Sequence, residues 1–177
     1  MDPGLDRFRT LLAFDIARLL RTDFNITVPL VFHDSEYEDK DRELIDELAA
    51  EWNVQISFLD ICQALLKVDR NTLVLAHGGP GLPIRSIIVD ITREEGGPAG
   101  FFCEDIPVIK TIKEEAKASR CWGFDHPTKR MAEMAEDYEM DDVCRIDKWK
   151  ATMYLKRHAI KDPPREGLAG RVLALFT

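Results

Sequence analysis

The chain has 177 residues, enough for one domain with a single hydrophobic core and too few for two domains of ordinary size. Hydrophobic residues make up 45% and charged residues 32%, which is typical of a soluble globular protein and argues against a disordered one. No apolar run approaches the roughly 20 residues of a membrane-spanning helix, and the first residues lack a secretory signal pattern. We therefore expect an intracellular protein, cytoplasmic, nuclear or both, with no membrane contact.

The net charge of −8 comes from 24 basic and 32 acidic residues. Nucleic-acid binding depends on clustered basic side chains that neutralise phosphates, so a nucleic-acid partner is not expected. The four cysteines form no C-x-x-C pair, which excludes zinc-ribbon and thioredoxin signatures. The apolar neighbours of Cys62 and Cys103 predict core positions, and Arg120 beside Cys121 makes that thiol the best candidate for reactivity.

The first predicted element is a buried helix that ends near residues 21–23, because apolar side chains from Leu5 to Leu19 recur at helical spacing. A short apolar run at 28–32 predicts a buried strand of the parallel type. An amphipathic helix is expected at 39–52, followed by a strand at 54–58. Residues 60–67 fit either a short helix or a crossover loop.

The second half begins with the clearest strand of the sequence, at 72–76, which runs into a glycine-rich turn at 77–81. A helix is expected at 83–91 and a fourth strand at 100–103. Helices are expected at 106–119 and 127–139, around a loop at 122–124. The period-2 pattern of 149–155 predicts a further strand.

The predicted elements define a single α/β domain at 1–161 and a C-terminal tail at 162–177. The apolar part of the tail, 172–176, fits an edge strand or a segment that docks on a partner, including a second copy in a homodimer. Alternating strands and helices predict a three-layer α/β sandwich with a mostly parallel, Rossmann-like sheet. Ligands of such sheets bind beyond the carboxyl ends of the strands, where 33–36 and 77–81 are expected.

The nucleotide-binding motifs G-x-G-x-x-G and G-x-x-x-x-G-K-S/T are absent from the sequence, as is the zinc motif H-E-x-x-H.

The segment from His77 to Gly81 resembles the oxyanion-hole loop of α/β-hydrolases, in which glycines expose backbone N–H groups to a developing oxyanion. The nucleophile motif G-x-S-x-G of those enzymes is missing. A tight turn is therefore the favoured interpretation. A divergent enzyme remains the alternative, as a hydrolase using this loop with Cys121 or a serine, or as a degenerate nucleotide-dependent transferase.

Acidic residues gather where the first strand meets the second helix, at Asp34, Glu36, Glu38, Asp39 and Asp41. They fit capping of the helix N-terminus, or, for Asp34, a hydrogen-bond acceptor for a ligand. His33 and His77 end two predicted strands, and a metal or haem site is conceivable if those strands are neighbours. The cofactor is unknown from sequence.

Two segments resemble a known family when their order and spacing are taken together. Residues 33–41, which follow an apolar strand and open a helix, resemble the D-P-x-F/Y-T-x-x-D segment of the "sensitivity to red light reduced"-like domains. Residues 68–77 resemble the v-x-x-x-T-l-x-x-x-P-H stretch of the same family, and 83–90 is similar to the helix of its fungal members. The resemblance covers about 28–105.

The resemblance carries over to the polar positions Asp34, Tyr37, Asp41, Thr72 and His77. The sequence departs from the family pattern where Ser35 and Ala76 replace prolines, Glu38 replaces threonine and Gly78 replaces a frequent cysteine. The family implies a regulatory role, linked to circadian output, light signalling and haem metabolism, with no established reaction.

Together these observations predict a non-catalytic regulatory domain that binds a small molecule or a protein partner. The predicted binding residues are Asp34, Glu36, Tyr37, Asp41, Thr72, His77, Gly78 and Gly79.

Overall fold

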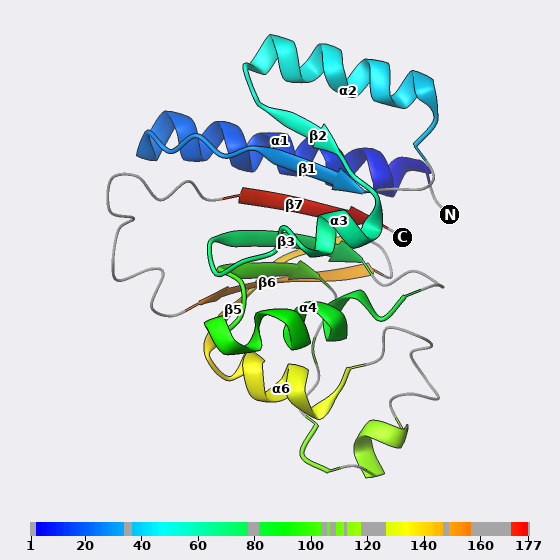
Figure 1. Ribbon diagram of the computed structural model, residues 1–177, viewed down its shortest axis with the longest axis vertical. Coiled ribbons are helices and arrows are strands. Elements are labelled where there is room, and N and C mark those ends of the chain that lie inside the picture. Colours follow the sequence, from blue (N-terminus) through cyan, green and yellow to red (C-terminus); the bar gives the residue numbers. More distant parts are fainter. Residues whose placement is uncertain are drawn as a thin grey trace.

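Helices and a single sheet make up the computed structural model, so the chain belongs to the α/β class (Figure 1). The residues that the structure describes are 3–33, 37–77, 82–103, 106, 109–111, 113–117, 127–146, 149–156 and 171–176. Within them, seven strands form one sheet in the order β2-β1-β7-β3-β4-β6-β5.

The first half of the chain alternates helices and strands as the hydrophobic periodicity predicts. Its elements are α1 (Pro3–Phe24), β1 (Leu30–His33), α2 (Asp39–Trp52), β2 (Ile56–Phe58), α3 (Ile61–Leu65) and β3 (Thr72–His77). α2 ends at Asn53, which adopts a left-handed conformation and donates its N–H to the carbonyls of Ala49 and Ala50. Asparagine tolerates this conformation better than most residues, so it forms an effective helix end.

The second half adds α4 (Ile84–Thr92), the short 3-10 helix η1 (Arg93–Glu95), β4 (Gly100–Cys103), a helical turn at 113–117, α6 (Lys129–Ala135), β5 (Tyr138–Ile146), β6 (Trp149–Lys156) and β7 (Arg171–Phe176). Among the described residues, no helix combines the length and the apolar character that crossing a membrane requires.

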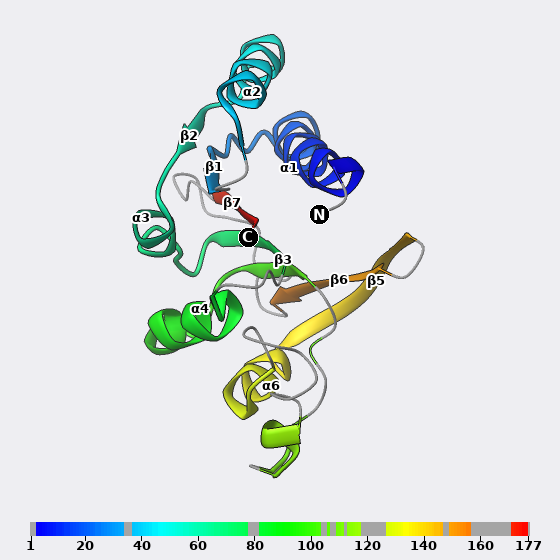
Figure 2. The same ribbon diagram turned by 90° about the vertical axis from the view of Figure 1, so that its right-hand side faces the viewer.

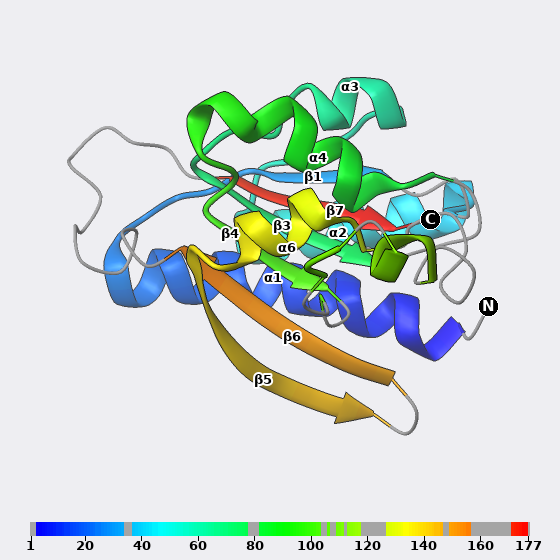
Figure 3. The ribbon, with the colours of Figure 1, turned by 90° about the horizontal axis from the view of Figure 1, so that it is seen from below.

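The sheet is parallel along β2, β1, β7, β3 and β4, and it ends in an antiparallel β5–β6 hairpin (Figure 3). Buried parallel strands carry apolar side chains on both faces, which explains the uninterrupted apolar runs of β1 and β3. Successive residues of these strands enter two different apolar clusters: Val31 and Val74 enter one, whereas Leu30 and Leu75 enter the other.

Helices cover both faces of the sheet (Figure 2). Residues of α1 and α2 pack with Leu30, Phe32 and Leu75 on one face. Residues of α3, α4 and α6 pack with Val31 and Val74 on the other. The two core clusters therefore lie on either side of one shared sheet.

The C-terminal strand corrects the prediction of an edge strand or a docking tail. β7 lies in the middle of the sheet, where it pairs with β1 through four residues and with β3 through six. Residues 171–176 are therefore an integral part of the domain. The physical reason is that β1 and β3 are not joined to each other, and β7 supplies the ladder partner that both require.

The region after β4 also differs from the predicted helices. The predicted helix at 127–139 divides into α6 and the start of the unpredicted strand β5, because Tyr138 turns into the core and pairs with Lys156. Among the described residues of the predicted helix at 106–119, residues 113–117 are helical, whereas 106 and 109–111 are not. The predicted loop at 122–124 lies outside the described residues.

The cysteine predictions are half confirmed. Cys103 is buried in β4, with 1% of its surface exposed. Cys62 is exposed on α3, so its predicted core position is wrong. α3 is a short helix that buries Ala64 and Leu65 and turns its cysteine outwards. Cys121 lies outside the described residues.

The connection from η1 to β4 depends on two glycines with positive φ, Gly96 at 79° and Gly97 at 87°. A Cβ on Gly97 would lie 2.6 Å from the Tyr138 Oη and 2.9 Å from the Met134 Sδ. The Tyr138 hydroxyl is buried and donates a hydrogen bond of 2.5 Å to the Pro98 carbonyl. Burial, and to a lesser degree the Asp137 charge, raises the pKa of the Tyr138 phenol well above its usual value.

Candidate functional site

The candidate site is the edge of the sheet where the parallel strands β1, β7 and β3 end. In the strand register, His33 lies beside Leu175 of β7 and His77 lies beside Phe176. β7 therefore separates the two histidines by two strand spacings, about 10 Å. The conceivable metal or haem site required β1 and β3 to be neighbours, and they are not. No group of three or more metal-ligating side chains occurs among the residues that the structure describes.

His33 has a structural role at this edge. Its Nδ1 lies 3.1 Å from the carbonyl oxygen of Leu59. A carbonyl can only accept a hydrogen bond, so Nδ1 carries the proton and donates it. Leu59 in turn donates its N–H to the carbonyl of Phe32 at 3.0 Å. The histidine ring thus fixes the connection between β2 and α3 against the end of β1.

Tyr37 connects the edge to α1. Its hydroxyl shares a hydrogen bond of 2.5 Å with the hydroxyl of Thr10, on the first half of α1. Its ring makes edge-on contacts with Phe32 and Phe58, with centroids 6.3 and 6.2 Å apart. The predicted binding residue Tyr37 is therefore partly buried and holds α1 next to the segment that follows β1.

Asp41 caps the helix that starts at the edge. Its Oδ2 accepts a hydrogen bond of 3.1 Å from the backbone N–H of Glu38, the N-cap residue of α2. The capping interpretation of the acidic residues is therefore confirmed for Asp41, which satisfies a backbone donor at the helix start. The predicted binding residues Asp34, Glu36, Gly78 and Gly79 lie outside the described residues.

Thr72 does not belong to this edge. It opens β3, whereas His77 closes it, so the two α-carbons lie about 16 Å apart along the strand. The Thr72 hydroxyl is buried and donates to the Asp69 carboxylate at 2.8 Å, while the Asp69 N–H donates to the Thr72 Oγ1 at 3.1 Å. Thr72 stabilises the turn that leads into β3, and its inclusion in the predicted site is wrong.

Two buried arginines on the helices near this edge were not predicted from the sequence. Arg9 on α1 and Arg85 on α4 each expose only 2% of their surface. Arg9 precedes Thr10, the partner of Tyr37, and Arg85 lies in the first turn of α4, which follows the end of β3. Their signal in the sequence is a charged residue at an apolar position of an amphipathic helix. Arg85, for example, shares its face with Ile88 and Val89.

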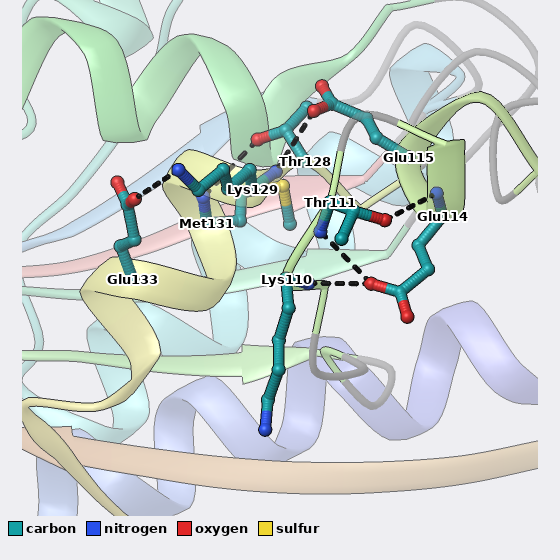
Figure 4. Close-up of polar contacts among 8 residues, drawn as sticks. All are labelled: Lys110, Thr111, Glu114, Glu115, Thr128, Lys129, Met131 and Glu133. Carbon is teal, nitrogen blue, oxygen red and sulfur yellow. Dashed lines mark hydrogen bonds and ion pairs between the residues drawn. The ribbon is translucent and has the colours of Figure 1, made fainter.

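A second group of polar residues, at the start of the helical turn 113–117 and at the start of α6, has a capping role (Figure 4). The Glu114 carboxylate accepts backbone hydrogen bonds from Lys110 at 2.8 Å and Thr111 at 3.0 Å, and these bonds lower the pKa of Glu114. Thr128 caps α6 by accepting the N–H of Met131 at 3.2 Å. These contacts satisfy helix ends, so we assign them no chemistry.

Comparison with known proteins gives no relative: no protein-family model, no curated protein and no solved structure matches the chain.

Proposed function

We propose that the protein is a non-catalytic regulatory domain that binds a small molecule with a carboxylate or phosphate group at the carboxyl edge of its sheet. The single observation that carries this proposal is the burial of Arg9, on α1, and of Arg85, in the first turn of the helix that follows β3. An arginine side chain stays charged at every physiological pH, and its planar group matches carboxylates and phosphates. Both guanidinium groups are positively charged, in a protein that is acidic overall.

The architecture supports the same location. Taken as a Rossmann-like three-layer sandwich, the fold would bind its ligand beyond the carboxyl ends of the parallel strands. α4 starts at that edge with no acidic residue in its first turn, and the positive end of its dipole favours a negative ligand. Asp34, Glu36 and His77 adjoin it in sequence and are the proposed specificity residues.

The family assignment is part of the proposal. A divergent member of the "sensitivity to red light reduced"-like domains would act by binding and would need no catalytic residues. Tyr37 and Asp41, two of the positions matched by the resemblance, form hydrogen bonds with Thr10 and with the Glu38 backbone. Members of that family often carry a cysteine directly after the histidine of this motif. In this chain Gly78 follows His77, so the proposed binding site includes no histidine–cysteine pair.

The first test is native mass spectrometry of the purified protein, together with its visible absorption spectrum. Excess mass that matches an organic acid, a phosphate ester or haem identifies the ligand. A thermal-shift series with simple carboxylates and phosphates follows, because a ligand that binds only the folded state raises the melting temperature.

The variants His77→Ala and Asp34→Ala test the location. We expect both to keep the far-UV spectrum of the parent and to lose the ligand-induced stabilisation. Arg70→Gln, an exposed residue before β3, is the matched control and should keep it. Unchanged stabilisation in both edge variants would contradict the proposed site.

A further inference from the structure

A hollow lies away from the carboxyl edge, in the groove between α4 and α6, which pack against each other. It has a volume of about 210 Å³. Its lining residues come from the end of α4 and η1, from the glycine turn, and from one face of α6 and the turn after it: Val89, Arg93, Gly96, Gly97, Arg130, Glu133, Met134 and Asp137. Pockets for drug-sized ligands have about 300–1,000 Å³, so this groove suits a smaller molecule.

The floor of the groove is apolar. Val89 is buried, with 4% of its surface exposed, and Met134 is partly buried. Gly97 is also buried and contributes no side chain, and Tyr138 lies directly behind it. Because a side chain at Gly97 would collide with Tyr138 and Met134, this part of the floor is formed by backbone alone.

The rim carries two positive and two negative side chains, and two of the four already have partners. The Arg130 guanidinium pairs with the Asp90 carboxylate at 2.7 Å. The Glu133 carboxylate pairs with the Lys129 ammonium at 3.3 Å, as Figure 4 shows.

Arg93 and Asp137 complete the rim. Within the part of the chain that the structure describes, neither of these two side chains forms an ion pair or a hydrogen bond. With respect to the described residues, one unpaired positive group and one unpaired negative group therefore face one small hollow with an apolar floor.

We infer that this groove binds a small zwitterion, an α-amino acid with an apolar side chain. Its carboxylate would bind the Arg93 guanidinium, its ammonium group would bind the Asp137 carboxylate, and its side chain would lie on Val89 and Met134. Charge-assisted hydrogen bonds of this kind are stronger than neutral ones. A simple anion or cation would satisfy only one of the two groups, and the four rim charges sum to zero, so neither sign is favoured.

The test is a titration of the 177-residue chain, monitored through the amide NMR signals of Gly96 and Gly97 and the side-chain Nε–H signal of Arg93. The probes are L-leucine, 4-methylpentanoate and 3-methylbutylamine. The last two are leucine without its ammonium group and leucine without its carboxylate. We expect L-leucine to shift these signals and to bind at least about tenfold more tightly than either analogue, since one lost charged contact of about 1.4 kcal/mol corresponds to tenfold.

Two variants assign the contacts. Arg93→Gln should abolish the preference for L-leucine over 3-methylbutylamine, and Asp137→Asn should abolish its preference over 4-methylpentanoate. Glu94→Gln is the control, because this residue is exposed, adjoins Arg93 and does not line the groove. Equal affinity for the three probes, no shift of the groove signals, or unchanged preferences in both variants would overturn the inference.

Discussion

Replacing Gly97 by alanine should destabilise the protein strongly, for two separate reasons. A left-handed backbone costs an L-residue about 1–2 kcal/mol, and φ is 87° at this position. The new methyl group would also lie 2.6 Å from the Tyr138 Oη, so the hydroxyl must move and its buried bond to Pro98 must break. A lost bond of this kind costs about 1–2 kcal/mol. We therefore expect Gly97→Ala to lower the free energy of unfolding by about 2–4 kcal/mol.

The neighbouring glycine provides a matched control. Gly96 has a similar φ of 79°, but its added Cβ would meet only the end of the flexible Lys156 side chain, at 3.0 Å. Gly96→Ala should therefore show the backbone cost alone, about 1–2 kcal/mol. Urea denaturation at pH 7, with the midpoint and slope fitted for each variant, measures the difference.

A double variant separates the collision from the backbone strain. Tyr138→Phe removes the hydroxyl that the new methyl group would strike, so the double variant Gly97→Ala/Tyr138→Phe should be more stable than the sum of the single effects by about 1 kcal/mol. Strict additivity, or equal losses for Gly96→Ala and Gly97→Ala, would refute this explanation of the turn.

Three further predictions concern the sheet, the pH dependence and the thiols. Ending the chain after residue 170 removes the four pairs of β7 with β1 and its six pairs with β3. At about 1 kcal/mol per backbone hydrogen bond this is comparable with the whole stability of a domain, so the far-UV spectrum should be that of an unfolded chain. A cooperative melt of the truncated chain would disprove the central placement. Because the pKa of Tyr138 is raised in the folded state, its contribution to stability is complete below pH 10 and decreases above it, by up to about 1.4 kcal/mol per pH unit. Urea midpoints between pH 8 and 11 should therefore fall more steeply for the parent than for Tyr138→Phe, and parallel curves would contradict the assignment. A thiol reagent should modify exposed Cys62 in the native protein and leave buried Cys103 unmodified until urea is added, as peptide mass mapping would reveal.

The elements that the sequence predicts well are those with a strong local pattern. β3 and β4 start where their apolar runs start, and α2 matches its predicted range because its apolar spacing and its capping residues agree. The strand β5 was missed because the predicted helix at 127–139 overlaps its first residues and because its residues 138–142 include three acidic residues. Its strand conformation comes from pairing with β6, a contact that no local pattern encodes.

The same distinction applies to the candidate site. Local sequence places His33 and His77 at strand ends, and the structure agrees for the backbone of both. Strand order is a non-local property, so the insertion of β7 between them could not be predicted. Thr72 was assigned to the site because it matches a position in the resembled family. A residue at such a position can stabilise the fold instead of binding a ligand, and the hydrogen bond of Thr72 to Asp69 shows a structural role.

The insertion of β7 has a consequence for the order of events during synthesis. Leu30 and Leu73 both pair with Val172, a residue from the other end of the sequence. A growing chain folds from its N-terminal side, yet until residues 171–176 have left the ribosome, β1 and β3 each present an unpaired edge towards the other. Such edges attract foreign strands, and contacts of this sequence separation form slowly. The nascent chain therefore presents these two edges from the completion of β3 until β7 has been made.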